Sequence, residues 1–131
     1  MSDANKTLIR RVYYDLMNGR RLELADEFYS PEFVSRDPAF PKSTKGPEGI
    51  KELLRQLDRQ FPDHMYSVED VFAEGDRVAV RWKVEGTVPS KFEIRGISIC
   101  RVKNGQICEV WQHWDSATLA SQTGFDAKAS M

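Results

Sequence analysis

The chain has 131 residues, of which 40% are hydrophobic and 30% charged, a balance typical of one folded domain rather than a disordered or fibrous chain. The 19 basic and 20 acidic residues leave a net charge of −1, which argues against a nucleic-acid-binding module and a polybasic membrane anchor. No apolar run approaches the roughly 20 residues of a membrane span. The polar first residues lead into no signal-peptide core, so we expect a cytoplasmic protein without nucleic-acid or membrane partners.

Metal and cofactor chemistry is not indicated by the side chains available. The two cysteines, Cys100 and Cys108, form no CxxC pair, and there are only two histidines. The glycine-rich nucleotide loops, the GxSxG elbow and the HExxH motif are all absent. We therefore expect neither a metal nor a cofactor.

The first half of the chain reads as helices. Leu8, Val12 and Leu16 recur every four residues and predict a helix over 4–19, ended by Asn18-Gly19 with glycine in a left-handed cap. A short helix over 21–29 and a short strand over 32–35 follow, and then a loop over 36–46. Gly46-Pro47 begins a third amphipathic helix over 47–61, because proline suits the first helical position.

The second half reads as strands over 65–73, 77–87, 91–103 and 106–115, followed by a short helix over 116–122. Asn104-Gly105 between two alternating segments is a strong hairpin signal. Helices followed by such a meander predict an α+β domain over 1–131, with the helices packed on the concave face of a curved antiparallel sheet. Such packing can leave a pocket between the two layers.

An ideal two-residue loop at Asn104-Gly105 pairs residues whose numbers sum to 209. One sheet face then carries an apolar set that needs a second layer, and a homodimer would supply it: Ile97, Ile99, Val110 and Trp114. The other face carries the pocket candidates Ser98, Trp111, His113 and Asp115, with Gly96 leaving room for a ligand. In this register Cys100 and Cys108 point to opposite faces, which argues against a disulfide.

Several short motifs, in the right order from about residue 5 to 124, resemble one known family. They are Tyr29-Ser30-Pro31-Glu32-Phe33-Val34, Arg36-Asp37-Pro38, Gly46-Pro47-Glu48-Gly49-Ile50, Phe61-Pro62-Asp63, the segment Gly75 to Trp82 and the segment Gly105 to Trp111. The chain resembles the SnoaL-like polyketide and ester cyclases of the NTF2-like superfamily. This resemblance implies a cone-shaped barrel of a strongly curved, antiparallel or mixed sheet, with three helices over a pocket, often as a dimer. It also implies an aspartate that acts as acid and base in an intramolecular aldol closure without metal or cofactor.

The chain departs from that family at the positions that carry the chemistry. The cyclases' catalytic aspartate falls on Gln112, and a cavity histidine of the group falls on Ser98. Glutamine has no titratable proton and cannot be a general base, so the cyclase mechanism does not carry over. The resemblance places Gln112 and Ser98 together in the pocket, whereas the ideal ladder separates them. A β-bulge would reconcile the two, and we favour the resemblance.

Other residues remain for the chemistry, each with a structural alternative. Asp115 is either a pocket acid or the N-cap of the last helix, and His113 is either a pocket base or a surface strand residue. Arg36 and Asp37 either line the pocket mouth, where Arg36 would grip an anion, or form a loop salt bridge. His64 is expected to face solvent.

Large side chains could supply the rest of a pocket wall. Trp82, Trp111 and Trp114 either line a cavity or belong to the core and the dimer interface. On the helices, Tyr14 and Phe61 belong by default to the faces that pack on the sheet, part of which lines the pocket in this fold.

These observations support a small, cofactor-free protein that binds a small apolar ligand, with cyclase- or isomerase-type acid–base chemistry if it is an enzyme. Its ligand contacts would be Gln112, Ser98, Asp37, Arg36, Tyr14, Trp82, Trp111 and Phe61, with Asp115 and His113 as candidate catalytic groups. The alternative is a non-catalytic binding or dimerisation module that kept the fold and lost the acid. A titrating carboxylate or histidine in the pocket would favour the enzyme, and neutral polar groups alone would favour the module.

Overall fold

The computed structural model describes residues 2–40 and 43–127. The domain expected over 1–131 extends beyond them, since residues 1, 41–42 and 128–131 lie outside the described part. The helices are α1 (Ser2–Arg11), its π-helical continuation η1 (Val12–Asn18), α2 (Leu24–Phe28), α3 (Gly46–Gln60) and α4 (Ser116–Thr123). The strands are β1 (Tyr29–Arg36), β2 (Met65–Glu74), β3 (Arg77–Gly86), β4 (Phe92–Lys103) and β5 (Gln106–Trp114).

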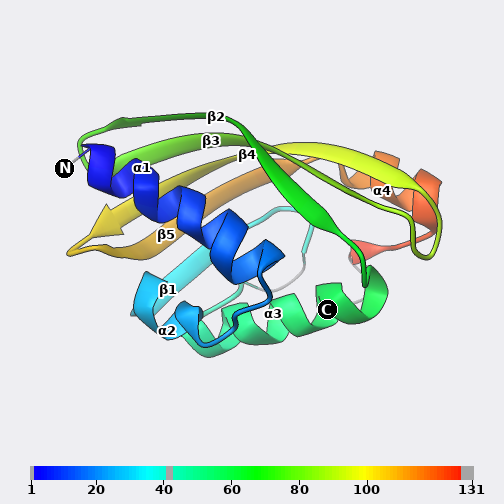
Figure 1. Cartoon of the computed structure of the whole chain (residues 1–131), viewed down its shortest axis with the longest axis horizontal. Coiled ribbons are helices and arrows are strands. Elements are labelled where there is room, and N and C mark those ends of the chain that lie inside the picture. Colours follow the sequence, from blue (N-terminus) through cyan, green and yellow to red (C-terminus); the bar gives the residue numbers. More distant parts are fainter. Residues whose placement is uncertain (1, 41–42, 128–131) are drawn as a thin grey trace.

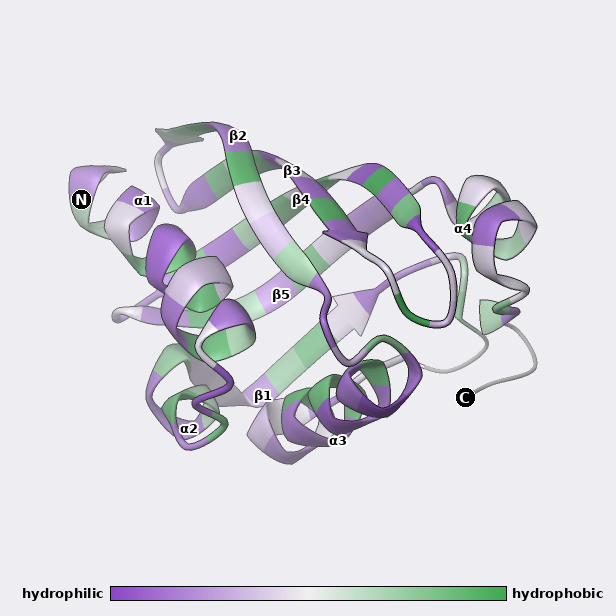
Figure 2. Cartoon of the chain, turned by 45° about the vertical axis from the view of Figure 1, so that its right-hand side comes forward, coloured by the Kyte–Doolittle hydropathy of each residue, from purple (hydrophilic) through white to green (hydrophobic). Residues whose placement is uncertain are grey.

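The strands form one curved sheet in the order β1-β5-β4-β3-β2, in which β1 runs parallel to β5 and the other pairs are antiparallel. Helices α1, α2 and α3 lie together on one side of this sheet, and α4 lies at one end (Figures 1 and 2). The predicted α+β architecture is therefore confirmed. None of the helices in the described ranges is long and apolar enough to cross a lipid bilayer.

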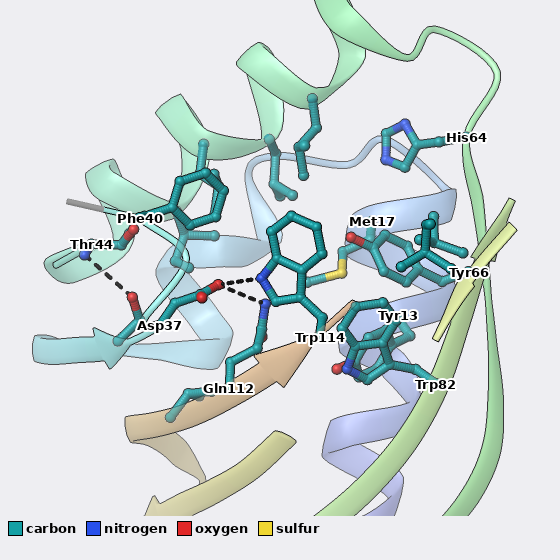
Figure 3. A pocket seen from close by; sticks show the side chains of 18 of the residues that line it. Tyr13, Met17, Asp37, Phe40, Thr44, His64, Tyr66, Trp82, Gln112 and Trp114 are labelled. Carbon is teal, nitrogen blue, oxygen red and sulfur yellow. Dashed lines mark hydrogen bonds between the residues drawn. The ribbon is translucent and has the colours of Figure 1, made fainter. Parts of the chain in front are cut away.

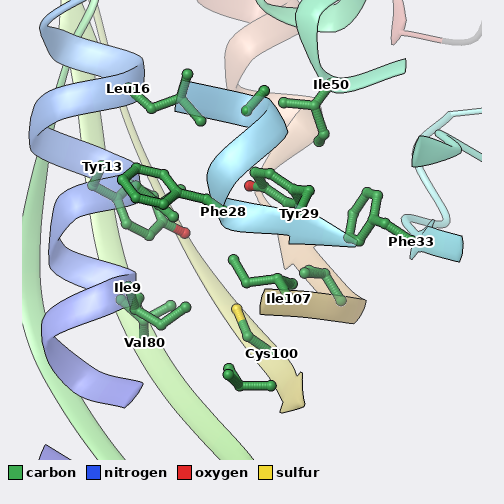
Figure 4. Packing of buried hydrophobic residues seen from close by; sticks show 14 of the residues in the cluster. Ile9, Tyr13, Leu16, Phe28, Tyr29, Phe33, Ile50, Val80, Cys100 and Ile107 are labelled. Atoms are coloured by element: carbon green, nitrogen blue, oxygen red, sulfur yellow. The ribbon is translucent and has the colours of Figure 1, made fainter. Parts of the chain in front are cut away.

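The core lies between the inner face of the sheet and the helices (Figure 4). Strand β4 shows the expected period of two, since its even-numbered residues from Phe92 to Val102 are buried and its odd-numbered residues are exposed or half-buried. The thiol of Cys100 lies among these buried residues, and both cysteines are free.

The ideal hairpin register is wrong beyond the first two pairs. Lys103 and Val102 face Gln106 and Ile107 as expected, but Arg101 then faces Glu109, so Cys108 is an extra residue on β5. This bulge reverses the facing of the rest of β5. It places Gln112 directly opposite Ser98, as the family resemblance requires.

Because of this bulge, the two sheet faces carry different residues of β5 from those expected. Val110 and Trp114 belong to the inner face, where Val110 is buried in the core. Trp111 and His113 instead lie opposite Ile99 and Ile97, which are 40% and 53% exposed on the outer face. The outer face is therefore less apolar than the ideal register suggests.

The first helix also ends differently from the prediction. Gly19 has a right-handed φ of −73°, and the left-handed conformation falls on Arg20, with φ of 59°. Glycine is needed at position 19 for space, because a Cβ there would lie 2.3 Å from the backbone oxygen of Asp15.

Candidate functional site

A cavity of about 120 Å³ opens between the helices and the inner face of the sheet. That is close to the size of an apolar cavity that accepts a benzene-sized ligand, about 150 Å³. Its walls are mainly apolar and aromatic side chains from η1, α3 and the strands, with a few polar groups among them (Figure 3). The polar groups decide what chemistry the cavity can support.

Asp37 is the carboxylate of this cavity and lies just after the end of β1. Its Oδ2 accepts a hydrogen bond of 2.8 Å from Trp114 Nε1 and one of 3.4 Å from Gln112 Nε2 (Figure 3). Its Oδ1 accepts one of 2.9 Å from the backbone N–H of Ala39. Burial raises the pKa of Asp37, and these three hydrogen bonds offset only part of that effect.

Gln112 is held in one orientation by its neighbours. Trp82 Nε1 donates to Ser98 Oγ at 3.0 Å, and that hydroxyl donates to Gln112 Oε1 at 3.1 Å. With its oxygen occupied by Ser98, the amide of Gln112 presents its N–H groups to Asp37. Ser98, which is 1% exposed, therefore acts behind the cavity wall rather than in it.

Three tyrosines also line the cavity: Tyr13 and Tyr29, which are buried, and Tyr66, which is partly buried. Burial raises the pKa of all three phenols, and that of Tyr66 rises to about 12. The phenols therefore stay protonated near neutral pH, where each can donate a hydrogen bond.

The structure brings four of the predicted ligand contacts to the cavity wall: Asp37, Gln112, Trp82 and Phe61. Gly96, expected to leave room for a ligand, instead makes room for the Trp82 indole. A Cβ at position 96 would lie 2.3 Å from Trp82 Cζ2.

Two carboxyl- or imidazole-bearing candidates lie outside the cavity lining. Asp115 is the N-cap of α4, where Oδ1 accepts from Thr118 N at 3.0 Å, and the hydrogen bonds from Thr118 lower the pKa of its exposed carboxyl. His113 is exposed on the outer face, because the bulge reversed that part of β5. The expectation of pocket chemistry at these two residues is therefore wrong.

Three predicted ligand contacts are likewise placed elsewhere. Trp111 lies on the outer face with His113. Arg36 points away from the cavity and pairs with Glu109 at 2.7 Å. The hydroxyl of Tyr14 accepts from Val68 N at 2.8 Å, and this side chain is 43% exposed, so its neighbour Tyr13 occupies the inner side of the helix.

His64 and Tyr66 are among the polar cavity residues that were not predicted from the sequence, and Trp114 was placed on the wrong face. His64 was expected in solvent but is 3% exposed, and Tyr66 follows it along the cavity wall. A signal existed for both, since Tyr66 and Val68 share one face of β2 and His64, which directly precedes the strand, continues the same alternation. Trp114 could be placed only with knowledge of the bulge.

Metal ligation finds no support in this site. Among residues 2–40 and 43–127, no group of three histidine, cysteine, aspartate or glutamate side chains is arranged to hold a metal ion. Asp37 is bound instead by N–H donors, which suits an ionisable carboxyl rather than a metal ligand.

The family model for the SnoaL-like polyketide cyclase matches residues 7–123. Among solved structures, IdmH of Streptomyces antibioticus, described as a "putative polyketide cyclase", is 28% identical with a TM-score of 0.79, covering 92% of this chain and 99% of its own. A "putative SnoaL-like polyketide cyclase" of Jannaschia is 19% identical with a TM-score of 0.82, covering 92% of each chain. An NTF2-like protein of unknown function from Burkholderia pseudomallei is 15% identical with a TM-score of 0.81, covering 93% of this chain and 98% of its own. No curated protein is a match.

Proposed function

Because the chain belongs to the SnoaL-like polyketide cyclase family, we propose that its cavity binds a small, mainly apolar carbonyl compound and that Asp37 is the acid–base group acting on it. The observation that carries this proposal is the raised pKa of a carboxyl inside an apolar cavity. A carboxylate with a raised pKa is a stronger base than an exposed aspartate. Asp37 thus takes over the role that Gln112 cannot perform.

The chemistry follows from the groups around that carboxylate. Asp37 removes a proton from a carbon next to a carbonyl, leaving an enolate and a protonated Asp37. In a cyclisation the enolate carbon attacks a second carbonyl of the same molecule, and the alkoxide that results takes the proton back from Asp37. In an isomerisation the proton returns to a different carbon.

Tyr66 is suited to stabilise the enolate. Desolvation raises the pKa of its phenol to about 12, so it stays protonated and can donate to a developing oxyanion. Gln112 and Trp114 are positioning residues, because their N–H groups hold the carboxylate of Asp37.

The proposal is tested by following proton exchange on a simple ketone. We expect the protein to exchange the α-protons of an aryl-alkyl ketone with deuterium from solvent, as followed by proton NMR. Asp37→Asn should lower the rate by about 100-fold or more, within the usual range for loss of a general base. Asp115→Asn is the matched control, since Asp115 is an exposed helix cap that asparagine can replace.

The pH profile gives a second readout. Since Asp37 must be ionised to act as a base, exchange should rise with pH through a pKa above the ordinary value for aspartate. Ligand binding with no exchange, or exchange that Asp37→Asn leaves intact, would contradict the role of Asp37. Binding without exchange would favour the alternative of a non-catalytic binding module.

We also propose that the protein is a homodimer formed through the outer face of the sheet. An apolar row crosses four strands there, with Phe72 opposite Ala79, Ala79 opposite Ile99, and Ile99 opposite Trp111. Phe72 is 67% exposed, which is unusual for so large an apolar side chain in a continuous row. The same face on a second copy is complementary to it by symmetry.

A further inference from the structure

His64 lies in the cavity wall well away from Asp37, and its ring points from the start of β2 toward the interior (Figure 3). The side chain is buried, although its neighbours Asp63 and Met65 are exposed. The proposed mechanism does not use it. A polar ring held inside an apolar cavity therefore needs an explanation.

The contacts of His64 determine its tautomer. Nδ1 lies 2.7 Å from the backbone oxygen of Phe61. A carbonyl oxygen can only accept, so Nδ1 carries the hydrogen, and in the neutral ring Nε2 bears a free lone pair. Nε2 is the one buried side-chain nitrogen or oxygen in residues 2–40 and 43–127 that has no hydrogen-bond partner. Such atoms are rare in folded proteins.

The groups around the ring keep it in place and neutral. Arg20 Nη2 donates to the backbone oxygen of His64 at 2.7 Å and lies 3.5 Å from Nδ1. Asp58 pairs with Arg20 at 3.2 Å and lies 3.8 Å from Nδ1, and the ring of Tyr66 packs edge-on at 5.7 Å between centroids. Burial, with a smaller contribution from Arg20, lowers the pKa of His64, while the Phe61 carbonyl, Asp58 and Asp63 oppose this shift.

Water is a poor partner for this lone pair. A buried water needs about 2–4 polar partners, and although Arg20 and Asp58 lie near Nδ1, the cavity lining is mainly aromatic or apolar. A ligand hydroxyl differs, because it donates one hydrogen bond while the rest of the molecule fills apolar space.

We infer that Nε2 of His64 accepts a hydrogen bond from a hydroxyl group of the ligand. The cavity then selects an apolar compound with a hydroxyl at one end, bound by His64, and a reacting carbonyl at the other end, near Asp37. This inference rests on the proposed function for the existence of a ligand, but not for the role of Asp37.

A matched pair of probes tests the inference. We would titrate the protein with para-propylphenol and with its methyl ether, which has the same apolar body but no donor. The wild type should bind the phenol about 10-fold more tightly than the ether, as expected for one buried hydrogen bond. His64→Leu should abolish this preference, and His64→Gln, which keeps an acceptor oxygen at a similar reach, should retain part of it.

Nitrogen NMR adds a second measurement, because the Nε2 resonance of a histidine with a purely structural role would not respond to the probes. In the free protein Nδ1 of His64 should be protonated and Nε2 should not. The Nε2 resonance should shift with the phenol but not with the ether. His113→Gln is the control, since His113 is exposed on the opposite face of the sheet.

The outcomes separate this inference from the proposed function. Equal binding of both probes, or a preference that survives in His64→Leu, overturns the role of His64 and leaves the proposal for Asp37 standing. If the preference for the phenol depends on His64 but Asp37→Asn leaves ketone exchange unchanged, the role of His64 is supported and the proposed role of Asp37 is overturned. If neither probe binds, the inference and the proposed ligand cavity are both overturned.

Discussion

At the scale of single residues, the site depends on one amide beside one carboxylate. Gln112 stands where the resemblance places a catalytic aspartate, and it donates to Asp37 rather than competing with it for a proton. The carboxyl that lines the cavity therefore lies just after the end of β1 and not on β5. Ser98 stabilises this arrangement, because it occupies the amide oxygen.

Gln112→Glu should therefore disturb Asp37 strongly. The new carboxylate would replace a donor that lies 3.4 Å from Asp37 Oδ2 with a second negative charge. Two carboxylates this close share a proton, so the apparent pKa of the pair should rise above that of Asp37 in the wild type. Carbon NMR of the carboxyl groups would measure it, and an unchanged titration of Asp37 would show that Gln112 does not contact it in solution.

His64 should make stability sensitive to mild acid. Its pKa in the folded protein is lowered, so the unfolded chain takes up the proton first as the pH falls. The contribution of His64 to the free energy of unfolding is fully present above the pKa of histidine in the unfolded chain, about 6.5, and is lost as the pH falls below it.

The measurement is urea unfolding of the wild type and His64→Gln between pH 7.5 and pH 5. The wild type should lose more unfolding free energy than His64→Gln over this range, because glutamine does not titrate. The opposing titration of Asp37 is common to both proteins and cancels in the comparison. Equal slopes for the wild type and His64→Gln would contradict the burial of a neutral His64.

At the scale of secondary-structure elements, local irregularities place the site. The π-helical segment η1 turns Tyr13 and Met17 toward the cavity. Asn18, at its end, exchanges two hydrogen bonds with the backbone of Tyr66, at 2.8 and 2.7 Å, which ties the helix to β2. The bulge at Cys108 turns Gln112 and Trp114 inward. Irregular elements of this kind are common near functional sites.

Strand β4 and Trp82 should be energetically coupled through Gly96. A Cβ at position 96 would overlap the Trp82 indole, so Gly96→Ala should destabilise the protein by about 1–3 kcal/mol through overpacking. The cost should be smaller in a Trp82→Phe background, because phenylalanine lacks part of the overlapping ring system. A double-mutant cycle by chemical unfolding tests this, and purely additive effects would exclude the contact.

At the scale of the whole molecule, the two faces of the sheet carry different sets of side chains. The inner face holds the core and the cavity, and the outer face carries the apolar row from Phe72 to Trp111. The guanidinium of Arg77 lies 5.5 Å from the Trp111 ring centroid, so this row also has a charged border. The proposed dimer and the proposed ligand chemistry would therefore use different surfaces of the sheet.

The proposed dimer should depend on the centre of that row. An interface above about 1,000 Å² is expected for a stable dimer, and a buried charge at its centre would be costly. Ile99→Arg should convert the dimer to a monomer in sedimentation at micromolar concentration, while ketone exchange persists. Lys103→Glu, at the end of the same strand, is a charge-changing control that should remain dimeric, and a monomeric wild type would refute the proposal.

Periodicity in the sequence was sufficient to determine the elements, their order and the α+β architecture. Alternation over 91–103 needs no tertiary information, since a strand with one buried face must repeat every two residues. Motif order likewise indicated the family, and Asp37, Trp82, Phe61 and Gln112 were named as pocket residues from it. These properties depend on local pattern and on residue identity.

The other cavity residues were decided by the tertiary structure. One extra residue at Cys108 exchanged the faces of Trp111 and Trp114, and no local pattern marks which residue of a strand bulges. Tyr13 rather than its neighbour Tyr14 lines the cavity, and His64, whose backbone oxygen accepts from Arg20, is buried although it was expected in solvent. For β5 the physical reason is that side chains of a strand alternate between its two faces, so one extra residue reverses the facing of every residue beyond it.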